Sequence, residues 1–146
     1  MNKHRFAAAL LATAALAYSL CGHLAAWAAT VVGPDHGANT VPCVECGMSA
    51  EVAGRFTSRL TTGGTTRYFC DIGDLVAFIE RTRPQGFAAS VRDFPSGDWL
   101  DAGAARFVLD KKAYATPMGW GVAAFRDGAS VAGPTLDFEA LRRALR

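Results

Sequence analysis

Between residues 55 and 92 the apolar positions first alternate and then recur at helical spacing. Arg55–Leu60 alternates over a short stretch, the TTGG that follows is typical of a turn, and Thr65–Phe69 has strand character. Two such runs separated by a short glycine-containing turn predict a β-hairpin. Phe87–Val91 predicts a further short strand.

The segment after the hairpin predicts a helix. Asp71 is a good N-cap, because its carboxylate can accept a hydrogen bond from a free backbone N–H of the first turn. Asp74 follows in that turn, and Pro84 with Gly86 predicts the end of the helix. The apolar residues at helical spacing are Ile72, Leu75, Phe78 and Ile79.

A second set of short elements follows. Trp99–Leu100, Arg106–Leu109 and Gly121–Phe125 predict strands separated by turns, and the last eleven residues predict a short amphipathic helix. The order is ββαβ followed by ββ(β)α. We therefore expect an α+β fold, a small single domain of two ββαβ-like halves with the second half truncated. The inner side of the last helix would carry Leu136, Phe138, Leu141 and Leu145.

The N-terminus has the form of an export signal. Lys3 and Arg5 precede a long apolar run, and Ala26–Ala28 is the best match to a cleavage site. The alternatives are an uncleaved membrane anchor over 6–29 and lipidation at Cys21. We expect a signal peptide at 1–28, a flexible tether at 29–42 and a domain at 43–146, located in the periplasm or anchored through the N-terminus.

Composition supports one exported domain and argues against nucleic acid as a partner. The chain has 146 residues, of which 51% are hydrophobic, with 15 basic and 13 acidic residues. Removal of residues 1–28 takes away two basic residues and leaves 13 of each sign. Because no basic tract remains, the slightly basic character belongs mainly to the signal.

Three cysteines remain in the predicted domain: Cys43 and Cys46 in a C-x-x-C, and Cys70. An exported location favours disulfides over free thiols. Because the number is odd, at least one thiol has no intramolecular disulfide partner, and three cysteines cannot make a disulfide scaffold.

The two methionines of the domain are candidate soft ligands. Met48 follows Cys46-Gly47, Met118 lies between Pro117 and Gly119, and neither falls on an apolar helix or strand period. Thiolates and thioethers are soft donors that select Cu(I). Gly47 would let the backbone bend so that Cys46 and Met48 point to one ion.

Two other functions begin from the same C-x-x-C. A zinc site would need Cys43, Cys46 and Cys70 together with His36, the single histidine after the signal. A periplasmic thiol-disulfide oxidoreductase would use Cys43 and Cys46, but such motifs normally follow a strand and open a helix. Here a segment rich in proline and glycine precedes the motif.

Four ordered segments between residues 43 and 138 carry a family resemblance. They are CVECGM at 43–48, RYFCDIGDLVAFI at 67–79, DWLDAGAARFVLD at 98–110 and TPMGWGVAAF at 116–125. As a set that follows an export signal, they resemble the NosL family of exported copper-binding proteins, which help to mature nitrous oxide reductase.

The resemblance implies a Cu(I) metallochaperone that is not an enzyme. Its metal ligands would be Cys46 and Met118 first, then Met48 and Cys43, with Met118 approaching from the second half of the domain. The implied partner is a copper-receiving periplasmic protein, nitrous oxide reductase or its maturation machinery. No role is transferred to Cys70. Motifs for hydrolases, metalloproteases and phosphate binding are missing from the sequence, which also argues against an enzyme.

Overall fold

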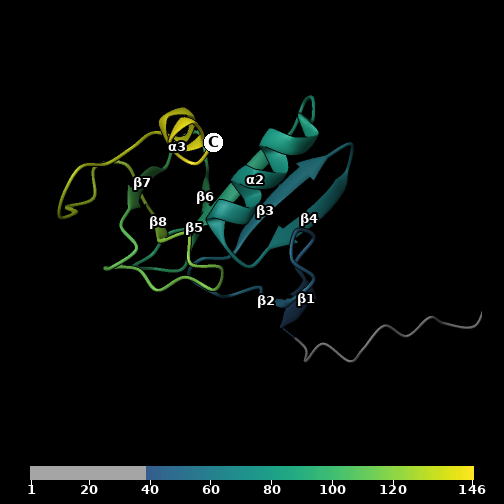
Figure 1. The fold of residues 1–146 in the computed structure, drawn as a ribbon, viewed down its shortest axis with the longest axis horizontal. Helices are drawn as coiled ribbons and strands as arrows, with labels where there is room; N and C mark the ends of the chain where they lie inside the picture. Colours follow the sequence, from purple (N-terminus) through teal and green to yellow (C-terminus); the bar gives the residue numbers. More distant parts are fainter. Residues whose placement is uncertain (1–38) are drawn as a thin grey trace, which may run out of the picture. The chain divides into compact units, whose positions relative to one another are not determined.

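The computed structural model describes residues 39–146, which form a small α+β domain as predicted (Figure 1). The predicted signal, Cys21 and His36 lie outside the described residues. No helix within 39–146 is long and apolar enough to cross a membrane. The elements in chain order are β1 (Thr40–Pro42), β2 (Ser49–Glu51), β3 (Ser58–Thr62), β4 (Thr65–Phe69), α2 (Ile72–Thr82), β5 (Ala88–Arg92), β6 (Trp99–Asp101), β7 (Arg106–Leu109), β8 (Val122–Phe125) and α3 (Phe138–Ala144).

The centre of the domain is a four-stranded antiparallel sheet in the order β4-β3-β5-β6. Side chains alternate between its two faces, so that Leu60, Phe69 and Val91 are fully buried on the face that α2 covers (Figure 1). The opposite face is only partly buried. There the guanidinium groups of Arg59 and Arg92 lie over the Trp99 ring, 4.3 and 3.9 Å from its centre.

Helix α2 begins and ends where the sequence predicts. The Asp71 side chain accepts a hydrogen bond from the Gly73 N–H at 3.1 Å, which confirms the N-cap. The helix ends at Thr82 because Arg83 adopts a left-handed conformation (φ 46°) immediately before Pro84. Its buried face carries Ile72, Leu75, Val76 and Ile79.

The second half consists of the β7–β8 hairpin and α3, with no strand after α3 in the part of the chain that the structure describes. Phe138 and Leu141 of α3 are buried, and the Phe138 ring lies 5.8 Å from that of Phe107 on β7. A backbone bridge between Asp93 and Ala124 connects this half to the end of β5.

Two expectations about boundaries are wrong. The flexible tether expected over 29–42 does not extend to residue 42, because Thr40–Pro42 forms β1 and pairs antiparallel with β2. Trp99–Leu100, expected as a strand of the second half, belongs to β6 (Trp99–Asp101) at the edge of the first sheet. In both cases a three-residue strand depends on its partner, and pairing between short strands leaves no periodic pattern in the sequence.

Candidate metal centre

The C-x-x-C motif lies on a tight loop, residues 43–48, between β1 and β2. The loop is closed by hydrogen bonds from the Cys43 N–H to the Met48 carbonyl (2.7 Å) and from the Gly47 N–H to the Cys43 carbonyl (2.9 Å). Gly47 has a φ of +75°, a conformation that other residues rarely adopt. The predicted bend at Gly47 is confirmed.

The loop is attached to the central sheet and to α2. The Val44 N–H donates to the Tyr68 carbonyl of β4 at 3.0 Å. Glu45 forms an ion pair with Arg81 near the end of α2. These contacts hold the C-x-x-C beside the end of β4, where the chain continues directly into Cys70.

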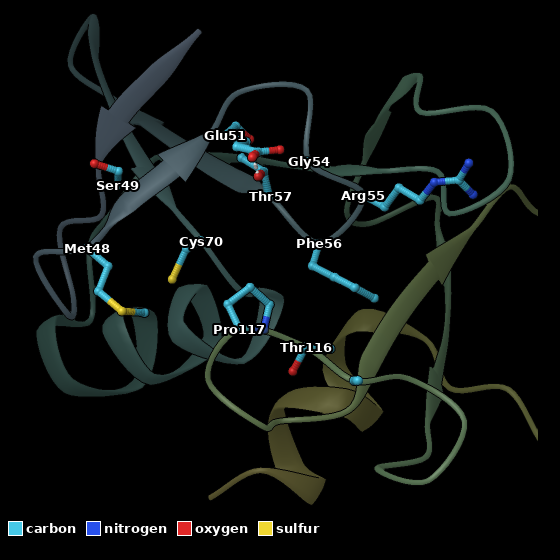
Figure 2. Close-up of a pocket in the computed structure, with 11 residues that line it drawn as sticks. Met48, Ser49, Glu51, Gly54, Arg55, Phe56, Thr57, Cys70, Thr116 and Pro117 are labelled. Atoms are coloured by element: carbon cyan, nitrogen blue, oxygen red, sulfur yellow. Dashed lines mark hydrogen bonds between the residues drawn. The ribbon is translucent and has the colours of Figure 1, made fainter. Parts of the chain in front are cut away.

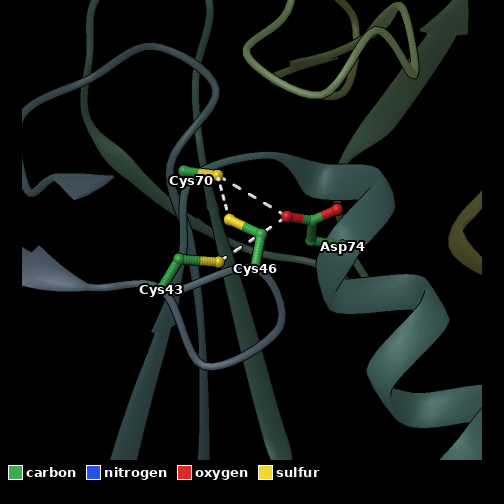
Figure 3. Close-up of side chains that lie close together, drawn as sticks. All are labelled: Cys43, Cys46, Cys70 and Asp74. Atoms are coloured by element: carbon green, nitrogen blue, oxygen red, sulfur yellow. Dashed lines mark hydrogen bonds between the residues drawn. The ribbon is translucent and has the colours of Figure 1, made fainter. Parts of the chain in front are cut away.

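Cys70 and Asp74 complete a compact group with the two loop cysteines (Figure 3). Cys70 follows β4, and Asp74 lies four residues later in the first turn of α2. The sulfur of Cys46 is 3.4 Å from that of Cys70. Asp74 Oδ2 accepts from the thiols of Cys43 at 3.6 Å and Cys70 at 3.5 Å.

These four residues form a cluster that could hold a metal ion. One donor atom from each of Cys43, Cys46, Cys70 and Asp74 lies within 4.8 Å of every other. All three cysteines are free, and Cys43 and Cys70 are only 2% and 5% exposed. The fold and the site together define a small α+β domain with a candidate metal centre of three thiols and a carboxylate.

Burial makes the two inner thiols weak acids. Burial raises the pKa of Cys43, although backbone N–H groups of Cys46, Cys70 and Glu45 point to its sulfur and act in the opposite direction. The pKa of Cys70 is raised strongly, first by burial and then by its contacts with the Cys46 and Cys43 sulfurs. In the metal-free protein at neutral pH, both thiols are therefore protonated.

Metal affinity should consequently rise with pH. A thiol must lose its proton to bind a metal, and the raised pKa values mean that this proton is still present at neutral pH. We expect the apparent association constant to increase about tenfold per pH unit for each proton released. Titrations at several pH values against a chelator of known pH dependence test this, and an affinity independent of pH would contradict it.

The four ligands implied by the resemblance occupy two kinds of position. Cys43 and Cys46 lie in the cluster. Met48 and Met118 lie on the surrounding loops with 45% and 42% of their surface exposed. Together with Val44 of the same loop, they are the exposed large hydrophobic residues of the described chain.

The loop that carries Met118 is fixed to the start of α2 by two aspartates. The Met118 N–H donates to Asp71 Oδ2 at 3.0 Å, and Trp120 Nε1 donates to Asp74 Oδ1 at 2.9 Å. The Trp120 indole lies directly over Gly73, where an added Cβ would be 2.0 Å from the ring. The second half of the domain thus contacts the cluster through the hydrogen bond between Trp120 and Asp74.

A cavity of about 540 Å³ adjoins the cluster (Figure 2). Met48 and Cys70 line one side of it, and Thr116 and Pro117 of the second half line another. The cavity gives access to the site beside Cys70. The remaining lining residues are Ser49, Glu51, Gly54, Arg55, Phe56, Thr57 and Ala115.

Sequence reasoning named Cys70 only in the alternative zinc site with His36, and it missed Asp74 as a member of the site. The sequence held one indication of the contact between Cys70 and Asp74. Asp74 is four residues after Cys70, and a helix that starts at Asp71 brings residues four apart onto the same side. The distance between Cys46 and Cys70 depends on the pairing of the loop with β4, which no local pattern reveals.

Comparison of the chain with protein-family models, curated proteins and solved structures finds no match.

Proposed function

We propose that this protein is an exported Cu(I)-binding metallochaperone, and not an enzyme, that passes copper to a periplasmic cuproenzyme. One observation supports this most directly: three thiols converge in one cluster, and two exposed thioethers lie on the loops around it. A set of soft sulfur donors favours Cu(I) over hard ions.

In this proposal the three thiolates hold the ion. Cys43, Cys46 and Cys70 supply a three-sulfur set, which a Cu(I) ion accepts without a fourth ligand. The two inner thiols are buried and Cys46 is partly exposed, so the ion would be shielded on one side and accessible on the other. An accessible side allows a ligand of the recipient to bind before the first ligand leaves.

Met48 and Met118 would act at the rim of the site. Exposed methionines are unusual, because a thioether side chain normally fills a gap in a core. Both are on loops that contact the cluster, and Met48 also lines the cavity beside Cys70. We propose that they exchange copper with the recipient, while the cysteines retain it.

The location and the recipient are inferred from the sequence. The predicted export signal places the domain in the periplasm, and the resemblance of residues 43–138 to NosL proteins points to nitrous oxide reductase or its maturation machinery as the recipient. The oxidoreductase alternative is less well supported, because the C-x-x-C lies on a loop between β1 and β2 and not at the start of a helix, where a nucleophilic thiolate is stabilised.

The test is anaerobic titration of the reduced protein with Cu(I) in the presence of a competing chelator, followed by transfer to a second chelator. We expect one Cu(I) per chain. Met48→Leu and Met118→Leu are matched variants, because they keep the apolar volume and remove the sulfur. Together they should slow transfer about tenfold or more while the Cu(I) affinity falls less than in a cysteine variant.

Two results would contradict the proposal. One is Cu(I) binding so weak that the chelator retains the ion at equal concentration. The other is transfer from the double leucine variant at the wild-type rate, which would leave the exposed methionines without a role in copper exchange.

A further inference from the structure

The carboxylate of Asp74 is placed as a ligand among the sulfurs. Asp74 Oδ2 lies 3.6 Å from the Cys43 sulfur and 3.5 Å from the Cys70 sulfur, and the sulfurs of Cys46 and Cys70 are 3.4 Å apart (Figure 3). The four donor atoms lie within 4.8 Å of one another and come from the 43–48 loop and from residues 70–74, which lead from β4 into the first turn of α2.

These separations fit a tetrahedron around a divalent ion. With Zn–S bonds of about 2.3 Å and a Zn–O bond of about 2.0 Å, ligand atoms are separated by roughly 3.8 Å for two sulfurs and 3.5 Å for a sulfur and an oxygen. The distances from Asp74 Oδ2 to the sulfurs of Cys43 and Cys70 match the second value. The sulfurs of Cys46 and Cys70 are slightly closer than the first value, and all other pairs of donor atoms lie within 4.8 Å.

The orientation of Asp74 is set by a second hydrogen bond. Trp120 Nε1 donates to Oδ1 at 2.9 Å, which leaves Oδ2 to face the sulfurs. Partners of this kind fix the orientation of a metal ligand, and their loss typically costs about 10- to 100-fold in metal affinity. Trp120 is in turn held by close packing on Gly73, which has no side chain.

Charge also favours a divalent ion in the complete set of ligands. Three thiolates and a carboxylate carry four negative charges, so a divalent cation leaves two uncompensated and Cu(I) leaves three. Cu(I) accepts a low number of soft ligands and has little preference for a carboxylate oxygen, whereas zinc accepts thiolate and carboxylate together.

We propose that Cys43, Cys46, Cys70 and Asp74 form a tetrahedral site for a divalent ion of the zinc class, with Asp74 as the fourth ligand. Asp74 then determines which metal binds, because the divalent ion takes its carboxylate as a ligand and Cu(I) does not. The proposal rests on the cluster alone and goes beyond the proposed copper function.

The experiment uses the reduced full chain without oxygen and compares Zn(II) and Cu(I) affinities against competing chelators. Asp74→Asn keeps the shape and an acceptor for Trp120 but removes the charge. Glu45→Gln is the matched control, since it removes one negative charge between Cys43 and Cys46 at a residue paired with Arg81. We expect Asp74→Asn to weaken Zn(II) binding about 10- to 100-fold and Cu(I) binding less than about threefold, with Glu45→Gln changing neither appreciably.

A second measurement needs no variant. X-ray absorption of the zinc-loaded wild-type protein should show three sulfur ligands and one oxygen, and Co(II) in place of zinc should give the visible spectrum of a tetrahedral thiolate complex. An all-sulfur or octahedral environment would overturn the proposal. Equal losses of Zn(II) and Cu(I) affinity in Asp74→Asn would also overturn it, because they would assign Asp74 a purely structural role.

The outcomes separate the two proposals. If Zn(II) binds through Asp74 and Cu(I) does not bind, the copper function fails and the zinc-class site stands. If Cu(I) binds tightly and Zn(II) binding is unaffected by Asp74→Asn, the zinc-class site fails and the copper function stands.

Discussion

Replacing Cys70 by serine should lower the Cu(I) affinity of the protein by about 100-fold or more, as much as replacing Cys46. Cys70 supplies one of three convergent thiols, and its sulfur is 3.4 Å from that of Cys46. A serine hydroxyl has nearly the same size but is a hard donor that holds Cu(I) poorly. Competition titration with Cu(I) measures the loss.

This prediction separates the structure-based ligand set from the one implied by the resemblance. With Cys46, Met118, Met48 and Cys43 as the ligands, Cys70→Ser would bind Cu(I) like the wild type and Met118→Leu would bind it weakly. Thermal unfolding of the metal-free Cys70→Ser protein is the control, because Cys70 is also part of the core and a loss of folding would lower affinity indirectly.

Replacing Gly73 by alanine should destabilise the domain by about 2–4 kcal/mol. The new Cβ would lie 2.0–2.4 Å from three atoms of the Trp120 indole, so the ring must leave its place over α2. Its hydrogen bond to Asp74 would be lost with it. Urea unfolding gives the free-energy change, and metal titration should show a parallel loss of Zn(II) affinity.

A double-mutant cycle tests the cause. In a Trp120→Ala background the space over Gly73 is empty, so Gly73→Ala should then cost little, since alanine favours helix over glycine by about 1 kcal/mol. Gly103→Ala is the control, because its Cβ would meet only a carboxylate oxygen of Asp101, at 3.0 Å. If Gly73→Ala were equally harmful with and without Trp120, contact with the indole would not be the reason.

The sequence predicted those parts of the fold that depend on interactions between residues close together in the chain. Helix α2 was predictable because its apolar period, its Asp71 cap and the Arg83-Pro84 end all act within a few residues. The bounds of β7 match the prediction. Helix α3 (Phe138–Ala144) is shorter than the predicted 136–146, because Leu136 instead forms a backbone bridge with Phe107 and Asp137 caps the helix. The β1–β2 pairing and the place of β6 were not predictable, because each depends on a distant strand.

The same distinction applies to the site. Cys43, Cys46 and the bend at Gly47 belong to one short loop, and the sequence pointed to them directly. Cys70 reaches them only because Val44 bonds to β4 and aligns the end of that strand with the loop. Asp74 could be placed on the helix from sequence, but its orientation depends on Trp120, 46 residues away.

The hydrogen bond from Val44 to Tyr68 also has a consequence for solubility. β4 is an outer strand of the four-stranded sheet, and the unpaired N–H and C=O groups of such a strand can pair with another molecule. The 43–48 loop pairs with one of these groups, the Tyr68 carbonyl, and lies beside the outer edge of β4. A change that loosens the loop would therefore both disturb the thiols and uncover a template for aggregation.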